Sequence, residues 1–389
     1  MPDLSITVDG LKLPNPFVIG SGPPGTNANV IGKAFDEGWG AVIAKTVSLD
    51  ASKVINVAPR YARMRVEKTI VGWENIELIS DRPFETWEQE FRQVKDAYPE
   101  RVLIASIMEE YSKDRWVEIV ERCQQAGVDA FELNFSCPHG LPERRMGAAM
   151  GQDPEILEEV CRWVSGAAQV PVWAKMTPNI THIEAPARAA LRAGCHGVSA
   201  INTILCVMGV DLKTLKPEPT VEGYTTPGGY SCRAVRPIAL RMVMECARMM
   251  AEEFPPDGKS SNGHVAANKH VSSRSLSGIG GVETGEDAAQ FLLLGANTVQ
   301  VCTGVMIHGY KLIHELTRGL EAFMEQHGFS TIDDFRGHSL QFFTTHADLV
   351  QRQAEAKAME RAKARGVVTE DTQWSGEKFV EQSSGLVAE

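Results

Sequence analysis

The chain contains 389 residues, of which 43% are hydrophobic and 23% are charged, which fits a globular protein with one large domain or two smaller ones. Its formal net charge of −11 and its isoelectric point near 5.5 disfavour binding to duplex nucleic acid. No uninterrupted apolar run reaches the roughly 18–20 residues that a membrane helix needs, so we expect an intracellular, soluble protein without a membrane partner.

The N-terminus and the cysteines carry little targeting or metal-site information. The first ten residues, MPDLSITVDG, show neither the basic flank and apolar core of a secretory signal nor the composition of a transit peptide. None of the eight cysteines forms a CxxC pair, which disfavours a zinc ribbon or an iron–sulfur cluster. We therefore expect reduced thiols and no metal site.

Short apolar runs recur along the chain, and each is bounded by glycine or proline. In chain order these predicted strands are 17–22, 41–46, 102–107, 130–136, 171–176, 197–203, 275–281 and 298–304. They are apolar throughout rather than alternating, which is typical of parallel strands that are buried on both faces.

Segments with helical spacing follow these runs, for example 114–127, which Gly127 would end, and 153–168, which Asp153 and Pro154 would begin. Eight such units over about 300 residues predict an α/β fold, the (β/α)8 TIM barrel. A doubly wound open sheet would favour a GxGxxG turn after its first strand. That turn reads GSGPPG (20–25) here, with two prolines where the helix would begin, so the barrel is favoured.

Three segments exceed a minimal barrel. Residues 47–101 are expected to form a long loop with a short helix on the face that carries the chemistry, and residues 204–233 form a second top-face loop. The polar segment 258–274 precedes a strand, so we expect a flexible insertion on the opposite face. We expect the barrel to span residues 1–335, followed by a C-terminal tail, 336–389, with a charged helix at 354–366.

The C-terminal ends of barrel strands normally build the active site. Asn134 and Ser136 lie two residues apart and would face the same way, and Cys137 would stand at the strand exit with a proline behind it. The other predicted ends supply Ser21 and Gly22, Lys45 and Thr46, Lys175, Asn202 and Thr203, Gly280 and Gly281, and Thr303 and Gly304. These residues are our candidates for the site.

The last two strand ends predict a phosphate site. GIGG (278–281) and CTG (302–304) offer backbone N–H groups with little side-chain bulk, at the place where barrels commonly hold a phosphate. Two lysines nearby suit a phosphorylated cofactor that becomes anionic on reduction, such as FMN.

Several motifs together resemble a known family. These are NFSCPHG (134–140), AKMTPNIT (174–181), INT (201–203), RPIALR (236–241) and SGIGG (277–281). They resemble the pyrimidine-reducing barrel of the dihydropyrimidine dehydrogenases, which is related to the dihydroorotate dehydrogenases. The resemblance runs from about residue 3 to about 335, and the stretch 336–353 resembles the short plant and algal form, which lacks the iron–sulfur and FAD domains of the animal enzyme.

The resemblance implies roles for individual residues. Cys137 would be the catalytic cysteine, and Cys232 stands where the family often has glycine. Substrate contacts would come from Asn75, Glu77, Asn134, Ser136, Asn202 and Thr203. Cofactor contacts would come from Ser21, Gly22, Lys45, Thr46, Lys175, Gly229, Gly280, Gly281, Thr303 and Gly304.

The same resemblance implies a reaction and its partners. FMN N5 would transfer a hydride to C6 of uracil or thymine, and Cys137 would give a proton to C5. NADPH is the implied electron donor, and a homodimer is the implied assembly. A separate electron-transfer partner stays open, as does a plastid or cytoplasmic location.

Two other functions stay open. A dihydroorotate dehydrogenase would run the same chemistry on a ring that bears a carboxylate, although Glu77 near the substrate would repel that group. A lyase or isomerase with a phosphate-binding barrel would carry no flavin, and Cys137 would then be a nucleophile or a bystander.

Overall fold

The computed structural model of the chain describes residues 2–51, 54–136, 146–256 and 271–363. The chain divides into two compact units, residues 1–340 and 341–389. In the second unit the described residues form α11 (His346–Lys363), which begins earlier than the predicted helix at 354–366. The assignment of residues 336–389 as a separate tail stays a prediction.

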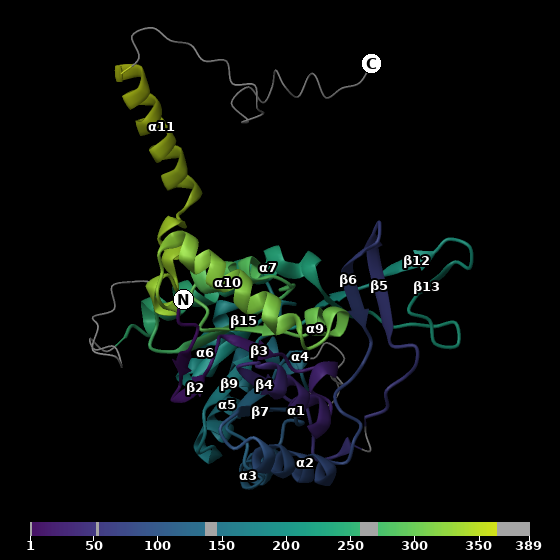
Figure 1. Cartoon of the computed structure of the whole chain (residues 1–389). Helices are drawn as coiled ribbons and strands as arrows, with labels where there is room; N and C mark the ends of the chain where they lie inside the picture. The colour runs from purple at the N-terminus through teal and green to yellow at the C-terminus, as the bar shows by residue number, and fades with distance from the viewer. Residues whose placement is uncertain (1, 52–53, 137–145, 257–270, 364–389) are drawn as a thin grey trace. The chain divides into compact units, whose positions relative to one another are not determined.

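Eight parallel strands close into a barrel and follow one another around it in chain order (Figure 1). They are β3 (Phe17–Ile19), β4 (Ala41–Ile43), β7 (Val102–Ile107), β8 (Ala130–Asn134), β9 (Val172–Lys175), β10 (Gly197–Ala200), β15 (Ser275–Ile279) and β16 (Thr298–Val301). Each of the eight predicted strands contains one of them, so the predicted TIM barrel is confirmed.

Helices connect the strands and pack outside the barrel. They are α1 (Ala28–Glu37), α2 (Phe84–Ala97), α3 (Lys113–Gln125), α4 (Ala148–Gly151), α5 (Pro154–Ala167), α6 (Glu184–Arg192), α7 (Arg236–Glu253), α8 (Gly285–Leu293), α9 (Thr303–His308) and α10 (Leu312–His327). Asp153 caps α5 as predicted, because its carboxylate accepts hydrogen bonds from the backbone N–H groups of Glu155 and Ile156. Within the described residues, no helix is long and apolar enough to cross a membrane.

The barrel strands are apolar on both faces because each face packs against a different layer. Phe17 and Val42 point outward and join the large core between strands and helices. Val18 and Ile43, one residue further along the same strands, join a smaller core inside the barrel. A side-chain period of two therefore produces two hydrophobic cores from one uninterrupted apolar run.

A short N-terminal hairpin, β1 (Ile6–Val8) and β2 (Leu11–Leu13), covers one end of the barrel. Val8 and Leu13 belong to the inner core. At the hairpin turn, Asp9 accepts hydrogen bonds from the Trp173 indole N–H at 2.6 Å and the Ser275 hydroxyl at 2.5 Å. This end is closed, which leaves the C-terminal ends of the strands as the open mouth.

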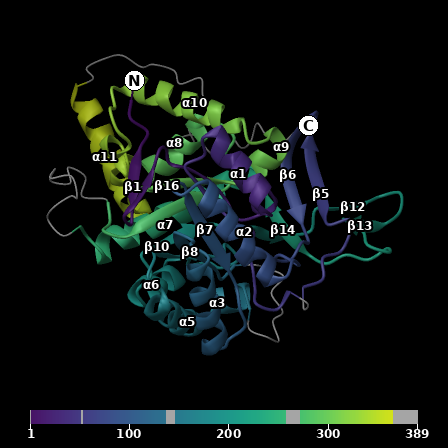
Figure 2. The ribbon, with the colours of Figure 1, turned by 60° about the horizontal axis from the view of Figure 1, so that its bottom comes forward.

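The two top-face insertions differ from the predicted loops because together they build a sheet (Figures 1 and 2). The first contributes the hairpin β5 (Tyr61–Val66) and β6 (Thr69–Asn75), and the second contributes β11 (Ile204–Cys206), β14 (Gly228–Ser231) and the separate pair β12 (Gly209–Asp211) and β13 (Lys216–Glu218). The four-stranded sheet has the order β11-β14-β6-β5. Its central pairing joins segments far apart in the chain, which local sequence patterns do not reveal.

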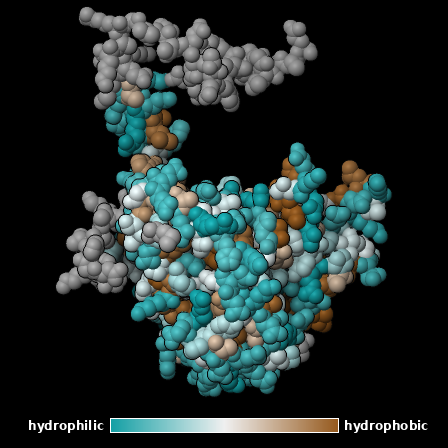
Figure 3. Space-filling view, in the orientation of Figure 1, coloured by the Kyte–Doolittle hydropathy of each residue, from teal (hydrophilic) through white to brown (hydrophobic). Residues whose placement is uncertain are grey.

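Apolar side chains are exposed at the outer ends of these insertions. Val66 in the first and Leu212 and Leu215 in the second are 58%, 85% and 76% exposed. Figure 3 shows brown, hydrophobic atoms gathered over the same projecting strands. The predicted insertion at 258–274 lies almost entirely outside the described residues.

Two helical glycines offer a matched test of the packing. A Cβ atom on Gly151, the last residue of α4, would collide with the carbonyl oxygen of Phe135, whereas a Cβ on Gly166 in α5 would meet nothing within 4 Å. We expect Gly151→Ala to lower the free energy of unfolding by more than about 1 kcal/mol, since a backbone atom must move. Gly166→Ala should instead raise it by about 0.5 kcal/mol, because alanine favours the helix.

Thermal unfolding followed by circular dichroism measures both changes. Opposite shifts in Tm are expected for the two variants. A Gly151→Ala protein that is as stable as the wild type would contradict the close approach of α4 to the segment that ends in Ser136.

Candidate active site

The inward side chains of the barrel form three levels. On β8 the inward residues are Ala130, Glu132 and Asn134, which belong in turn to the inner core, a buried polar layer and the open mouth. On β9, Trp173 lies in the inner core and Lys175 lies one level higher. The alternation of the strands therefore places polar groups directly above an apolar floor.

The buried polar layer is built around an ion pair. Lys175 Nζ lies 3.2 Å from Glu132 Oε1 and donates to Gln300 Oε1 at 2.9 Å. The Gln300 amide nitrogen donates in return to Glu132 Oε2 at 2.8 Å and to the hydroxyls of Ser199 and Ser277 at 3.1 and 3.0 Å. All five residues are buried, so each polar group needs these partners.

Sequence reasoning predicted only Lys175 of this layer. Glu132, Ser199, Ser277 and Gln300 are polar residues at inward positions of strands that are otherwise mostly apolar. A polar residue at an inward position of a buried strand is the signal that could have identified them.

A chain of hydrogen bonds crosses the mouth above this layer. Ser21 and Thr46 share a hydroxyl contact at 3.2 Å, and the Asn134 amide nitrogen donates to Thr46 at 3.0 Å. The Ser136 hydroxyl donates to Asn134 Oδ1 at 3.1 Å, and the Asn202 amide nitrogen donates to Ser136 at 2.6 Å. The contacts fix the orientations of both asparagine side chains.

A cavity of about 1120 Å³, part of it open to solvent, occupies the mouth. The predicted site residues that line it are Ser21, Gly22, Lys45, Thr46, Asn75, Glu77, Asn134, Lys175, Asn202, Thr203, Gly280, Gly281, Thr303 and Gly304. Ser136 lies behind the wall, against Asn134 and Asn202, and Gly229 accepts a hydrogen bond from the Asn75 amide nitrogen at 3.2 Å. Cys137 lies outside the described residues.

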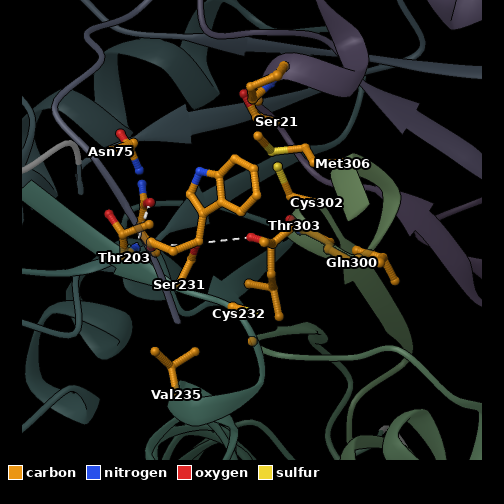
Figure 4. Close-up of a pocket in the computed structure, with 18 of the residues that line it drawn as sticks. Ser21, Asn75, Thr203, Ser231, Cys232, Val235, Gln300, Cys302, Thr303 and Met306 are labelled. Atoms are coloured by element: carbon orange, nitrogen blue, oxygen red, sulfur yellow. Dashed lines mark hydrogen bonds between the residues drawn. The ribbon is translucent and has the colours of Figure 1, made fainter. Parts of the chain in front are cut away.

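The inserted sheet forms one wall of the cavity. The Ser231 hydroxyl on β14 donates to the Trp73 carbonyl on β6 at 3.1 Å and lies 2.9 Å from the hydroxyl of Thr303, the first residue of α9 (Figure 4). Trp73, Ser231 and Tyr61 also line the cavity, and the sequence did not mark them as site residues. This contact ties the insertions to the barrel rim.

Glu77 is a carboxylate that lines the cavity and has three partners. Lys45 Nζ lies 3.0 Å from Oε2, which also accepts the Tyr61 hydroxyl at 2.8 Å. Arg60 lies 3.0 Å from Oε1. We call these four residues the Glu77 cluster. Both oxygens of Glu77 therefore have partners, and its role as a substrate contact stays a prediction.

Glycine loops border the opposite side of the cavity. Gly281 has a φ of 71°, and a Cβ atom there would lie 2.7 Å from the Cys232 carbonyl oxygen. A Cβ atom on Gly304 would lie 2.7 Å from the Val282 carbonyl oxygen. Only glycine fits such positions, so the backbone itself faces the cavity. Cys232 has a φ of 81°, in the left-handed region that favours glycine.

Glu283 lies at the cavity rim beside these glycines. Arg233 and His308 contact its carboxylate at 2.5 and 2.9 Å. Burial raises the pKa of Glu283, but the hydrogen bonds from Arg233 and His308 outweigh it and hold the pKa below its ordinary value. Its negative charge is therefore balanced locally.

Cys302 is a second thiol at the mouth and was not predicted as a site residue. It lines the cavity, and a Cβ atom on Gly22 would lie 2.5 Å from its sulfur. Burial raises the pKa of Cys302 to about 11, although Lys45 and Lys175 oppose the rise. Among the described residues, no group of three or more His, Cys, Asp or Glu side chains could hold a metal ion.

The raised pKa makes Cys302 a weak nucleophile. We expect its alkylation by iodoacetamide to be slow at pH 8 and to accelerate about tenfold per pH unit up to a pH near 11, because only the thiolate reacts. Mass spectrometry of the peptide that contains Cys302 follows the reaction. In the unfolded chain the Cys302 thiol should have its ordinary pKa of about 8.5, so its alkylation rate should level off above that pH. A rate that levels off near pH 8.5 in the folded protein would contradict this environment.

Comparison with known proteins places this site in a family. The dihydroorotate dehydrogenase family model matches residues 3–256 and 267–324. The chain is 62% identical over its whole length to the chloroplastic dihydropyrimidine dehydrogenase (NADP(+)) of Arabidopsis thaliana, covering 88% of that protein. It is 40% identical to the NAD-dependent dihydropyrimidine dehydrogenase subunit PreA of Escherichia coli (strain K12), covering 86% of this chain and 76% of that one. It is 30% identical to the catalytic subunit of dihydroorotate dehydrogenase B (NAD(+)) of Pyrococcus abyssi, and the match covers 87% of this chain and 99% of that protein. The chain therefore belongs to the dihydroorotate dehydrogenase family.

Proposed function

We propose that this protein is a flavin-dependent dihydropyrimidine dehydrogenase that reduces uracil and thymine to their 5,6-dihydro forms. The observation that carries the proposal is one cavity that joins glycine loops on one side to oriented asparagines on the other. The names of the Arabidopsis and E. coli relatives point to the same reaction.

The residues present fit a flavin. The cavity extends from the asparagines to the glycine loops, and these loops leave room for a phosphate against the backbone. We propose FMN, because both loops follow the seventh and eighth barrel strands, where a single phosphate commonly binds. It would be held by Ser21, Gly22, Lys45, Thr46, Lys175, Gly229, Gly280, Gly281, Thr303 and Gly304. When bound and reduced, the flavin supplies the hydride.

Lys175 would stabilise negative charge at the floor of the cavity. Its ammonium group is held by Glu132 and Gln300 and is only 4% exposed. A cation in such a fixed and poorly solvated position interacts strongly with an anionic ligand. The ion pair with Glu132 keeps this cation in place before any ligand arrives.

Asn134 and Asn202 would recognise the pyrimidine edge, together with Asn75, Glu77 and Thr203, and Ser136 would act from behind the wall by orienting both asparagines. Asn134 uses one N–H on Thr46, and its Oδ1 receives the Ser136 hydroxyl. Asn134 Oδ1 also accepts the Ser136 backbone N–H at 3.1 Å, so Asn134 offers a ring carbonyl its second N–H. Asn202 Oδ1 accepts the Thr203 N–H at 2.7 Å, which leaves Asn202 one lone pair for a ring N–H and a second N–H for a ring carbonyl. That pattern suits the alternating donors and acceptors of uracil.

Cys137 would supply the proton. It directly follows Ser136, whose hydroxyl contacts both asparagines, although Cys137 itself lies outside the described residues. A thiol with an ordinary pKa of about 8.5 keeps its proton at neutral pH and can release it to the C5 carbanion.

NADPH is the electron donor we propose, because the name of the Arabidopsis relative includes NADP(+). The E. coli relative is named as a subunit, so a separate electron-transfer partner is the other possibility. A homodimer and a plastid location stay predictions.

A dihydroorotate dehydrogenase activity fits this cavity less well. Four charged residues among those described line it, namely Lys45, Glu77, Lys175 and Glu283. Each of the two lysines already contacts a carboxylate, Glu77 or Glu132. A substrate carboxylate would find no unpaired lysine there, whereas a neutral base needs none.

The test of this function is a steady-state assay under air-free conditions, with NADPH and either uracil, thymine or orotate. We expect turnover with the two neutral bases, and product analysis should identify the dihydropyrimidine. Cys137→Ala should retain bound flavin but lose at least 100-fold in kcat, since general acid catalysis typically contributes about 10²–10⁴.

Cys302→Ala is the control, because it removes the other thiol of the mouth. Its kcat should fall far less than that of Cys137→Ala. Near-normal turnover by Cys137→Ala would remove that thiol from the mechanism, and turnover with orotate alone would overturn the proposed substrate.

A further inference from the structure

Two residues at the base of the first insertion contact Glu77 besides Lys45, Arg60 at Oε1 and Tyr61 at Oε2. Arg60 directly precedes β5, and Tyr61 is its first residue. The Arg60 carbonyl accepts a hydrogen bond from the Ile76 N–H at 2.9 Å, which brings the two ends of the hairpin together next to Glu77. The geometry of the Glu77 cluster is therefore set by the hairpin backbone.

Tyr61 is oriented by the same sheet. It lies opposite Asn75 in the β5–β6 pairing, and its ring packs against Trp73 with centroids 5.8 Å apart. The guanidinium carbon of Arg63 lies over the Trp73 ring, 4.3 Å from its centroid. The phenol therefore reaches Glu77 Oε2 from a packed position rather than from a mobile side chain.

The Tyr61 hydroxyl keeps its proton and so remains a hydrogen-bond donor to Glu77. Burial and the neighbouring Glu77 raise the pKa of this phenol well above its ordinary value. The hydroxyl consequently keeps its proton throughout the neutral range and donates to the same oxygen that faces Lys45.

The charge count shows what this arrangement does to Lys45. Glu77 contacts two cations, Lys45 through Oε2 and Arg60 through Oε1. Lys45 and Glu77 are 11% and 10% exposed, so water screens their interaction poorly, whereas Arg60 is 32% exposed. A Glu77 carboxylate that moved would leave Lys45 as an unpaired, poorly solvated cation at the mouth, where it would attract a substrate carboxylate.

We propose that Arg60 and Tyr61 are positioning residues that hold Glu77 on Lys45, and that they thereby set the preference for a neutral pyrimidine over one that bears a ring carboxylate. This inference rests on the proposed function, because it concerns the substrate class of the same cavity. Arg60 and Tyr61 would influence substrate choice through Glu77, and this role does not require either residue to touch the base or the flavin.

The experiment measures the dissociation constants of uracil and orotate on the flavin-loaded enzyme, from the change in flavin absorbance during titration. The quantity of interest is the ratio of the two constants. Tyr61→Phe removes one hydroxyl and should reduce the preference for uracil about fivefold, the effect of one hydrogen bond. Glu77→Gln, which removes the charge that pairs Lys45, should reduce it further.

Arg60→Gln separates positioning from simple electrostatics. The loss of a positive charge would by itself strengthen the exclusion of orotate, because orotate is an anion. If Arg60 acts by holding Glu77 on Lys45, the preference for uracil should fall instead. Arg60→Lys, which keeps a cation, should restore part of it.

Two control variants remove matched contacts elsewhere. Tyr98→Phe deletes a phenol that donates to the Asp36 carboxylate at 2.8 Å, and Arg188→Gln deletes an arginine that contacts Glu253 at 2.5 Å. None of these four residues lines the cavity, so the ratio should stay at the wild-type value. Tm and flavin content of every variant report on folding, and Arg60→Gln tests the inference if Tyr61→Phe does not fold.

The outcomes distinguish the inference from the proposed function. A wild-type enzyme that binds orotate as tightly as uracil overturns the proposed substrate preference. A wild-type enzyme that prefers uracil, with the preference lost in Glu77→Gln but intact in Tyr61→Phe and Arg60→Gln, overturns only the positioning role. A stronger preference in Arg60→Gln overturns it as well.

Discussion

The ion pair between Lys175 and Glu132 is the interaction on which the site depends. Removing two charges from water is expensive, and only close contact together with further hydrogen bonds compensates for it. Gln300 on a third strand bonds both members of the pair, and Ser199 and Ser277 on two further strands accept from its amide nitrogen, so the layer is satisfied only when the barrel is closed. Closing the barrel therefore also fixes the Lys175 cation beneath the cavity.

The insertions complete what the barrel alone cannot provide. The strand ends present amides, hydroxyls and lysines around a mouth that would otherwise be open, and the sheet of β5, β6, β11 and β14 covers one side of it. The same sheet carries Glu77 and Tyr61 to Lys45. Under the proposed function, the barrel ends would supply the groups that act on the base, and the insertion would add Glu77 and its partners to substrate selection.

The sequence predicted the barrel and most of its rim, for a physical reason. Strands that are buried on both faces are recognisable as apolar runs, and parallel strands end at one rim, so their terminal residues must meet. Lys45, Asn134, Asn202 and Thr303 line the cavity as that argument requires. Cys137 lies outside the described residues, so its predicted position stays a prediction.

The sequence did not reveal contacts that depend on distant pairing. The β14–β6 pairing joins Gly229 to Asn75, and neither local pattern predicts the other. For the same reason Tyr61 was missed as a lining residue, and the three partners of Glu77 were not predicted. Partners of a side chain are a tertiary property, and propensity and periodicity do not contain them.

The central claim is that this cavity binds a flavin that passes reducing equivalents to a pyrimidine. The most direct measurement is the visible absorbance of the purified chain, first as isolated and then with added FMN. The spectrum is recorded again after NADPH is added without oxygen, and finally after uracil is added. The account predicts a yellow protein that NADPH bleaches and uracil recolours. A protein that stays colourless with added FMN, or a reduced flavin that uracil does not reoxidise, would contradict it.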